Sequence, residues 1–215
     1  KLHVFHLSTE IETNLFDNKV SLEEKKITSE VCVHHLWFTE EDYCKKGNFI
    51  KWNPSIKKSS DQKGLWEALN DDRIDILATD HAPHLESEKN QDYVNSPSGG
   101  PMVQHALPAM LTAYKRGKIS FEKIIEKACH NPAKLFKIKK RGFIREGYFA
   151  DLVLIDLNKK NKVSKDSLFY KCGWSPFEGI TFEASVIKTF VNGEIVYDLG
   201  KIVSEPLGQI LKFDR

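Results

Sequence analysis

The first part of the chain contains three short segments with the hydrophobic pattern of β-strands. Residues 2–7 and 27–33 alternate apolar and polar side chains, which is typical of a strand with one buried face. Residues 74–78 are apolar except for Asp75 and end abruptly in polar side chains. A short apolar run of this kind indicates a parallel strand that is buried on both faces.

Charged segments with a few apolar positions separate the three predicted strands. Residues 11–26 fit a surface helix followed by a turn, with Ser8 or Thr9 as the helix cap. Residues 60–69 fit a capped amphipathic helix. Strands and helices therefore alternate, and this alternation predicts βαβ units and a parallel sheet.

The sequence changes character after residue 84. Residues 85–100 are rich in Glu, Asn, Ser, Pro and Gly, which predicts a long irregular loop that binds or covers a ligand. One helix is expected to open near Gln104 and run to Tyr114. A second helical region is expected over residues 120–136, with Asn131-Pro132 breaking it.

Two later segments predict a region built from strands. Residues 148–156 follow two glycines and form an apolar run, and residues 186–196 fit a pair of strands with a hairpin turn at Asn192-Gly193. We therefore predict an α/β part over residues 1–140, followed by a β part with a tail over residues 141–215.

Composition and charge narrow the class of protein. The 215 residues are 40% hydrophobic and 29% charged, which is ordinary for a globular protein. A formal net charge of +2 gives no reason to expect nucleic acid or an anionic membrane as a partner. No apolar stretch approaches the roughly 18 residues of a membrane span. The four cysteines are far apart without CxxC spacing, which predicts reduced thiols and a cytoplasmic location.

Candidate chemistry is concentrated where two of the predicted strands end. Asp80, His81 and His84 lie within five residues, directly after the apolar run at 74–78. A carboxylate and two imidazoles at a strand end can bind a divalent metal ion, move a proton or hold an anionic substrate. His6 lies at the end of the first predicted strand, which would place it on the same rim of a sheet. We prefer this interpretation to that of a polar loop whose aspartate caps a turn.

A pair of histidines, His34 and His35, follows the second predicted strand. Adjacent side chains on a strand point to opposite faces, so at most one of the two can face a pocket. We assign the pair a structural role, or a role in supporting the ligands of a site.

The string at residues 78–84, Ala-Thr-Asp-His-Ala-Pro-His, closely resembles the signature of the dihydroorotases within the metal-dependent amidohydrolase superfamily. The resemblance implies that Asp80 ends the eighth strand of a (β/α)8 barrel, contacts a metal ion and serves as the general base. It also implies that His84 holds the substrate carboxylate. Dihydropyrimidinases and allantoinases usually carry a different residue at the position of His84, so these other cyclic amidases are the less favoured alternative.

Two further segments carry the same resemblance. Residues 3–9, His-Val-Phe-His-Leu-Ser-Thr, resemble the sixth-strand segment of the family, which implies that His6 is a metal ligand. Residues 51–57 resemble a loop in which Asn53 would contact the dihydroorotate ring, and Asn53 has the donors and the acceptor for such a ring. Gln104 and His105 depart from the pattern of the family and are candidates without an assigned role.

The resemblance covers almost the whole chain but only the later part of the family's length. It implies strands six to eight of a (β/α)8 TIM-type barrel, followed by part of a small β-sandwich. The implied activity is reversible hydrolysis of L-dihydroorotate to N-carbamoyl-L-aspartate in pyrimidine synthesis, with one or two divalent ions, zinc, as cofactor.

The histidines of the first barrel strand, the carboxylated lysine of the fourth and the histidine of the fifth have no counterpart in this sequence. We therefore expect the amino-terminal half of the same enzyme as a partner and an inactive isolated chain. Assembly into a homo-oligomer is left open, and so is a non-catalytic, dihydroorotase-like partner that serves assembly.

Overall fold

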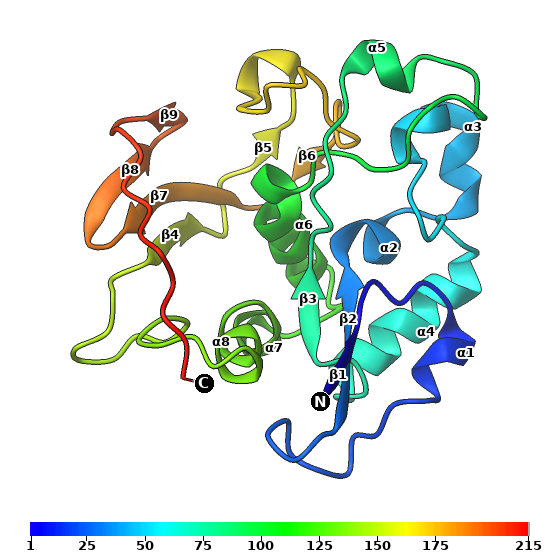
Figure 1. Cartoon of the computed structure of the whole chain (residues 1–215). Helices are drawn as coiled ribbons and strands as arrows, with labels where there is room; N and C mark the ends of the chain where they lie inside the picture. Colours follow the sequence, from blue (N-terminus) through cyan, green and yellow to red (C-terminus); the bar gives the residue numbers. More distant parts are fainter. Residues whose placement is uncertain (215) are drawn as a thin grey trace.

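The computed structural model describes residues 1–214 and begins with a three-stranded parallel sheet (Figure 1). Its strands, in spatial order, are β1 (Leu2–Val4), β2 (Ile27–Cys32) and β3 (Ile76–Ala78). Leu2 lies opposite Ile27, and Glu30 lies opposite Ile76. The prediction of a parallel sheet connected through helices is confirmed.

The first two strands are shorter than the sequence pattern predicts. The strand β1 ends at Val4, and the backbone then turns at His6, whose φ of +38° lies outside the region that strands occupy. The strand β2 ends at Cys32, and the residues after it form a helix instead of extending the strand.

Short helices cover the connections between the strands. They are α1 (Glu10–Thr13), α2 (Val33–Trp37), η1 (Glu40–Asp42), α3 (Tyr43–Lys46), η2 (Gly47–Ile50) and α4 (Ser59–Asn70). The helix α1 begins after Thr9, one of the two predicted caps, with a capping box in which Thr9 and Glu12 bond each other's backbone N–H groups. It forms only one turn of the helix that was predicted over 11–26.

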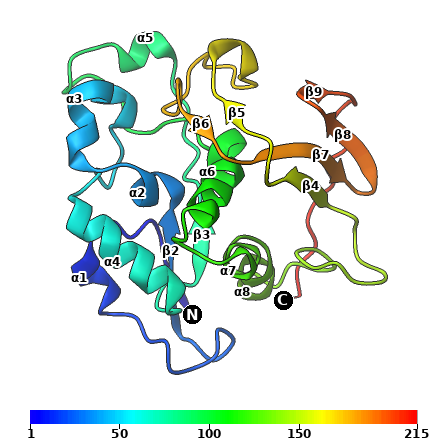
Figure 2. The ribbon, with the colours of Figure 1, turned by 180° about the vertical axis from the view of Figure 1, so that it is seen from behind.

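The helices α1 and α4 lie side by side (Figures 1 and 2). Their close approach depends on Gly64, because a Cβ atom there would lie 2.4 Å from Cγ of Glu10. This contact fixes the first connection of the parallel sheet against α4.

A second group of helices follows β3. They are α5 (Glu86–Lys89), α6 (Val103–Lys115), α7 (Phe121–Ile125), the π-helix η3 (Glu126–His130) and α8 (Asn131–Leu135). The prediction that Asn131-Pro132 breaks the helical region is wrong, because Pro132 lies in the first turn of α8, where a missing N–H is tolerated. None of the helices within residues 1–214 combines the length and the apolar character needed to cross a membrane.

The last third of the chain is built mainly from strands. They are β4 (Leu152–Asp156), β5 (Asn161–Lys162), β6 (Thr181–Phe182), β7 (Ser185–Val191), β8 (Glu194–Asp198) and β9 (Lys201–Ile202), with the short helix η4 (Lys165–Ser167). An antiparallel sheet has the order β4-β7-β8-β9, and β5 pairs with β6. The hairpin turn between β7 and β8 is confirmed, since Asn192 and Gly193 both have positive φ, as a type I′ turn requires.

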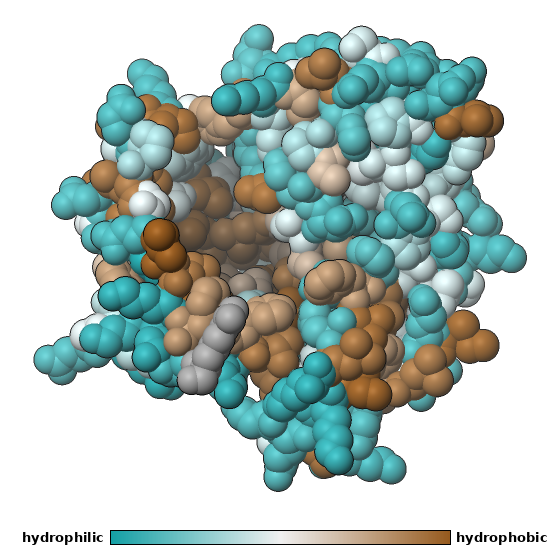
Figure 3. All heavy atoms as spheres, in the orientation of Figure 1, coloured by the Kyte–Doolittle hydropathy of each residue, from teal (hydrophilic) through white to brown (hydrophobic). Residues whose placement is uncertain are grey.

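The hydrophobic core includes residues from both parts of the chain. Val31 and Trp52 of the first part belong to the same buried cluster as Val163, Phe177 and Phe182 of the second. Between α6 and the antiparallel sheet lies a cavity of about 570 Å³, and Figure 3 shows a hollow with apolar walls on this face. The segment around residues 163–182 therefore packs on the first part, while the outer sheet stands away from it.

The parallel sheet remains open within residues 1–214. Its edge strands are β1 and β3, and the described residues contain no closed barrel. At the β1 edge, Leu2 and Phe5 are 57% and 61% exposed, and Ile27 of the neighbouring strand β2 is 50% exposed. The structure is thus a mixed α/β arrangement with an uncovered apolar edge.

A buried ion pair accounts for Asp75, the charged residue in the apolar run at 74–78. The Nζ atom of Lys25 donates to Oδ1 of Asp75 at 2.6 Å, and each side chain is only 4% exposed. The other carboxylate oxygen accepts the N–H of Ser29 at 3.0 Å. The pair therefore joins the segment before β2 to the segment before β3.

We expect Lys25→Met in the complete protein to lower the free energy of unfolding by about 3–5 kcal/mol, because Asp75 is left charged and buried without its cation. Urea denaturation measures the change. The control is Lys26→Met, at an exposed neighbouring lysine, which should change the free energy by less than about 0.5 kcal/mol. Equal effects of the two substitutions would contradict a stabilising role for the ion pair.

Candidate active site

The parallel strands place two of the predicted site residues, His6 and Asp80, at the same end of the sheet. His6 lies two residues beyond the end of β1, and Asp80 lies two residues beyond the end of β3. Between them, β2 ends at Cys32 and passes directly into α2. Because the three strands are parallel, all of these residues lie at the carboxyl ends of strands.

His6 and Asp80 share an unusual backbone. Their φ angles are +38° and +43°, in the left-handed region that costs energy for residues other than glycine. Neither side chain has a hydrogen-bond partner among residues 1–214, although the His6 ring contacts Phe5. Two residues that have strained backbones at equivalent positions, and whose side chains make no hydrogen bond, are typical of a ligand-binding or metal-binding site.

Electrostatic effects connect His6 and Asp80 to the end of β2. Burial raises the pKa of the Cys32 thiol well above its ordinary value, and the charges of Glu30 and Asp80 raise it further. Burial lowers the pKa of His35 to about 4, and His6 contributes to the decrease. His6 thus lies close enough to α2 for its charge to shift the pKa of His35, and Asp80 lies close enough to Cys32 to shift the pKa of the thiol.

The interpretation of His34 and His35 as the end of a strand is wrong. Both belong to the first turn of α2, where neighbouring side chains do not point to opposite faces, and their ring centroids lie 4.3 Å apart. One ligand atom each from Cys32, His34 and His35 lies within 4.8 Å of the other two, so the group could hold a metal ion. Cys32 was predicted only to be a reduced thiol, and the sequence signal for this group is the spacing Cys-x-His-His.

The segment that carries Asn53 lies beside this group. Asn53 itself is exposed, while the carbonyl oxygen of the next residue, Pro54, lies 3.1 Å from Nε2 of His35. The ammonium group of Lys57 donates to Ser55 within the same segment. The exposed side chain of Asn53 can therefore contact a ligand, whereas the ammonium group of Lys57 is bonded within its own segment.

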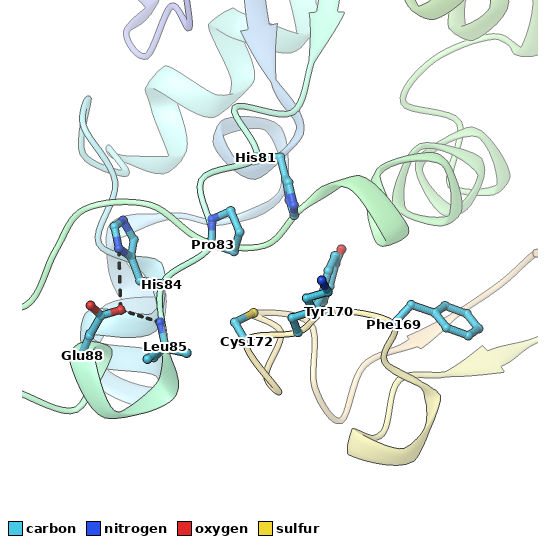
Figure 4. A pocket seen from close by; sticks show the side chains of 9 residues that line it. His81, Pro83, His84, Leu85, Glu88, Phe169, Tyr170 and Cys172 are labelled. Carbon is cyan, nitrogen blue, oxygen red and sulfur yellow. Dashed lines mark hydrogen bonds and ion pairs between the residues drawn. The ribbon is translucent and has the colours of Figure 1, made fainter. Parts of the chain in front are cut away.

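His84 and His81 line a cavity of about 460 Å³ that opens beyond the end of β3 (Figure 4). Figure 4 shows His84 facing Glu88, at 4.0 Å, and His81 facing Tyr170. The ring of His84 donates from Nε2 to the Ser98 carbonyl at 3.0 Å. Nδ1 of His81 accepts the Met102 N–H at the start of α6, so the proton of this ring is on Nε2.

The segment over residues 85–100, which was predicted to be an irregular loop but begins with the short helix α5, is held in place by a buried lysine. The ammonium group of Lys89 donates to the carbonyl oxygens of Pro97 and Gly99 at 2.7 and 2.9 Å, and burial lowers its pKa to about 8. Gly99, with φ +120°, packs so closely that a Cβ atom would lie 2.6 Å from the Ala82 carbonyl oxygen. Gly99 thus packs against the backbone of residue 82, while a Cβ atom at Gly100 would meet the rings of Trp52 and Trp174.

Gln104 and His105, which had no assigned role, hold the segment 167–175 against α6. The amide of Gln104 donates to the Ser167 carbonyl at 2.7 Å and accepts the Phe169 N–H at 2.9 Å. Nδ1 of His105 lies 3.0 Å from Oγ of Ser175, and burial lowers the pKa of His105 to about 4. Both residues therefore position the segment that forms one wall of the cavity beside His81 and His84.

Comparison with known proteins supports a single family. The sequence model described as the amidohydrolase family matches residues 3–196. The chain is 39% identical to the dihydroorotase of Halobacterium salinarum over 171 residues, which are 80% of the chain and 40% of the relative. It is 37% identical to the dihydroorotase of Methanosarcina mazei over 213 residues, which are 96% of the chain and 46% of the relative.

The fold agrees with this result. The structure superposes on the L-hydantoinase (dihydropyrimidinase) from Arthrobacter aurescens with a TM-score of 0.85 and 28% sequence identity. The superposition covers 94% of this chain and 46% of the hydantoinase chain. The chain spans about half the length of the curated relatives it matches. With a family match over most of its residues, the chain belongs to the amidohydrolase family.

Proposed function

We propose that the chain is part of a dihydroorotase, which interconverts L-dihydroorotate and N-carbamoyl-L-aspartate. The observation that carries the proposal is the equivalent placement of His6 and Asp80, two residues beyond the ends of parallel strands, with strained backbones and uncommitted side chains. The identity to dihydroorotases supports it. Hydrolysis of L-dihydroorotate by the complete enzyme, and its loss when Asp80 is replaced, tests it.

The donor groups of His6 and Asp80 fit a divalent metal ion. An imidazole nitrogen and a carboxylate oxygen are both ligands that zinc accepts, and neither group is occupied by a hydrogen bond within residues 1–214. A catalytic zinc normally has three protein ligands, so a complementary segment would have to supply the rest. When bound, one or two zinc ions would polarise the ring carbonyl and activate a water molecule.

The remaining roles are those that the resemblance to dihydroorotases implies, and the positions of the side chains support them. Asp80 would accept a proton from the attacking water and pass it to the ring nitrogen as the amide bond breaks. His84, at the rim of the cavity, would hold the substrate carboxylate through a charge-assisted hydrogen bond. Asn53, exposed beside α2, would donate to and accept from the ring amide.

We also propose the finer architecture and the partner. The parallel sheet would be strands six to eight of a (β/α)8 barrel over residues 1–140, and residues 141–215 would belong to a β-sandwich. The amino-terminal half of the same enzyme would cover the β1 edge, where Leu2 and Phe5 are exposed, and the adjacent Ile27 of β2. That half would also supply the missing ligands.

A dihydropyrimidinase-type cyclic amidase is the second candidate. The similarity in structure to an enzyme described as a hydantoinase and dihydropyrimidinase favours it. Such an enzyme would use the same metal chemistry on a ring without a carboxylate. His84, which would then have no anionic group to hold, separates the two candidates.

We expect His84→Ala in the complete enzyme to raise KM for L-dihydroorotate about tenfold to a hundredfold, the effect of losing one charged hydrogen bond. Bound zinc should remain, because His84 lies four residues beyond Asp80 and bonds Ser98 instead of a metal ligand. Steady-state kinetics and metal analysis give the two readouts. His130→Ala, at another half-buried histidine, is the control, and loss of zinc from the His84 variant would contradict the assignment.

A further inference from the structure

The junction between β2 and α2 carries the sequence Cys32-Val33-His34-His35, and three of these side chains form a closed group. Cys32 and His34 are 0% exposed and His35 is 3% exposed. One ligand atom from each lies within 4.8 Å of the others. A thiol and two imidazoles thus lie close together and are buried from water. Buried polar groups normally have hydrogen-bond partners within the protein.

The hydrogen bond of His35 shows which of its nitrogens is free. A carbonyl oxygen can only accept, so Nε2 of His35 must carry the proton that bonds the Pro54 carbonyl at 3.1 Å. The other nitrogen, Nδ1, then has a lone pair, and it is buried without any hydrogen-bond partner. Metal-binding histidines characteristically donate their second N–H to a backbone carbonyl in this way.

The face of the His34 ring packs on a neighbouring aromatic ring, whereas the nitrogens at its edge have no hydrogen-bond partner. Its ring stacks on Trp52 with centroids 4.3 Å apart and an angle of 4° between the planes. Both ring nitrogens are buried and have no hydrogen-bond partner. Burial and the neighbouring histidines lower the pKa of His34 well below its ordinary value, so its ring is neutral and has a lone pair available at neutral pH.

We propose that Cys32, His34 and His35 form a metal site of their own, adjacent to but separate from His6 and Asp80, and that its ion is Zn²⁺. One sulfur and two imidazole nitrogens suit zinc and exclude the hard cations Mg²⁺ and Ca²⁺, which require oxygen ligands. The thiol of Cys32 is deprotonated on binding and releases one proton to solvent for each ion, with no change of oxidation state. The fourth position of a tetrahedral zinc is left to a water molecule or another exogenous ligand.

Cobalt substitution distinguishes this site from the one proposed for His6 and Asp80, because only a thiolate ligand gives a sulfur-to-cobalt charge-transfer band. The complete protein is stripped of metal and titrated with Co²⁺, with the near-ultraviolet spectrum and the bound metal measured together. We expect a charge-transfer band whose final intensity corresponds to one thiolate-bound ion. Cys32→Ser should lose the band and one equivalent of metal, while Cys44→Ser, at an exposed cysteine, should retain both.

Two further variants test the proposal even if the Cys32→Ser variant does not fold. His6→Ala should retain the band, and His35→Gln, whose amide can still donate to the Pro54 carbonyl, should lose one equivalent of metal. X-ray absorption of the zinc-loaded unsubstituted protein should show a sulfur neighbour at about 2.3 Å. Zinc with only nitrogen and oxygen neighbours, or a cobalt band that survives in Cys32→Ser or disappears in His6→Ala, would overturn the proposal.

Discussion

Replacing Asp80 with asparagine in the complete enzyme is expected to lower kcat/KM for L-dihydroorotate by about 10²–10⁴-fold, the range for loss of a general acid or base. Asparagine keeps an oxygen that can contact a metal ion, but it cannot accept and return a proton. Bound metal should therefore fall much less than turnover. Steady-state kinetics and metal analysis on the same preparation separate the two effects.

Asp166→Asn is the matched control for this substitution. Asp166 is an exposed aspartate of η4, outside the three strand ends, so its variant should retain the kinetics of the unsubstituted enzyme. A value of kcat/KM for Asp80→Asn within tenfold of that of the control would show that Asp80 does not carry the proton.

The second large effect is expected when residues 1–215 are produced alone. We expect no measurable turnover of L-dihydroorotate and no cooperative thermal transition. The β1 and β3 strands have open edges within the described residues, and Leu2, Phe5 and Ile27 are at least half exposed. Because the net stability of a domain is only about 5–15 kcal/mol, an uncovered apolar face of this kind is enough to remove it.

Circular dichroism during heating and an assay with added zinc are the two measurements. The control is the same chain produced together with the amino-terminal half of a related dihydroorotase, which should restore both the transition and the turnover. A cooperative transition with zinc-dependent turnover by residues 1–215 alone would contradict the proposed partner.

The elements that follow from local sequence could be predicted. The strand positions, the Thr9 cap and the Asn192-Gly193 turn each depend on a few neighbouring residues, and the structure confirms them. The position of Asp80 beyond β3 follows from the same pattern, whereas His6 was placed at the end of a strand predicted over residues 2–7 and lies beyond β1 instead. What the pattern does not contain is their positive φ, because alternation of apolar residues carries no information about the turn after a strand.

The features that depend on distant residues could not be predicted. The apolar pattern of residues 27–33 continues to Val33, yet the chain becomes helical there, where His34 packs on Trp52. Lys89 resembled any charged residue of a polar loop, but it is buried against the carbonyls of Pro97 and Gly99. Contacts between segments decided both outcomes, overriding local propensity.

We propose that this chain forms part of a dihydroorotase, and comparing the rates at which the complete enzyme hydrolyses different substrates tests this proposal most directly. Zinc-loaded enzyme is assayed side by side on L-dihydroorotate, 5,6-dihydrouracil and allantoin, with His84→Ala in parallel. The proposal predicts that kcat/KM is at least about tenfold higher for L-dihydroorotate, and that His84→Ala removes this preference, since one charged hydrogen bond supplies it. Equal or faster hydrolysis of dihydrouracil or allantoin, unaffected by His84→Ala, would contradict it.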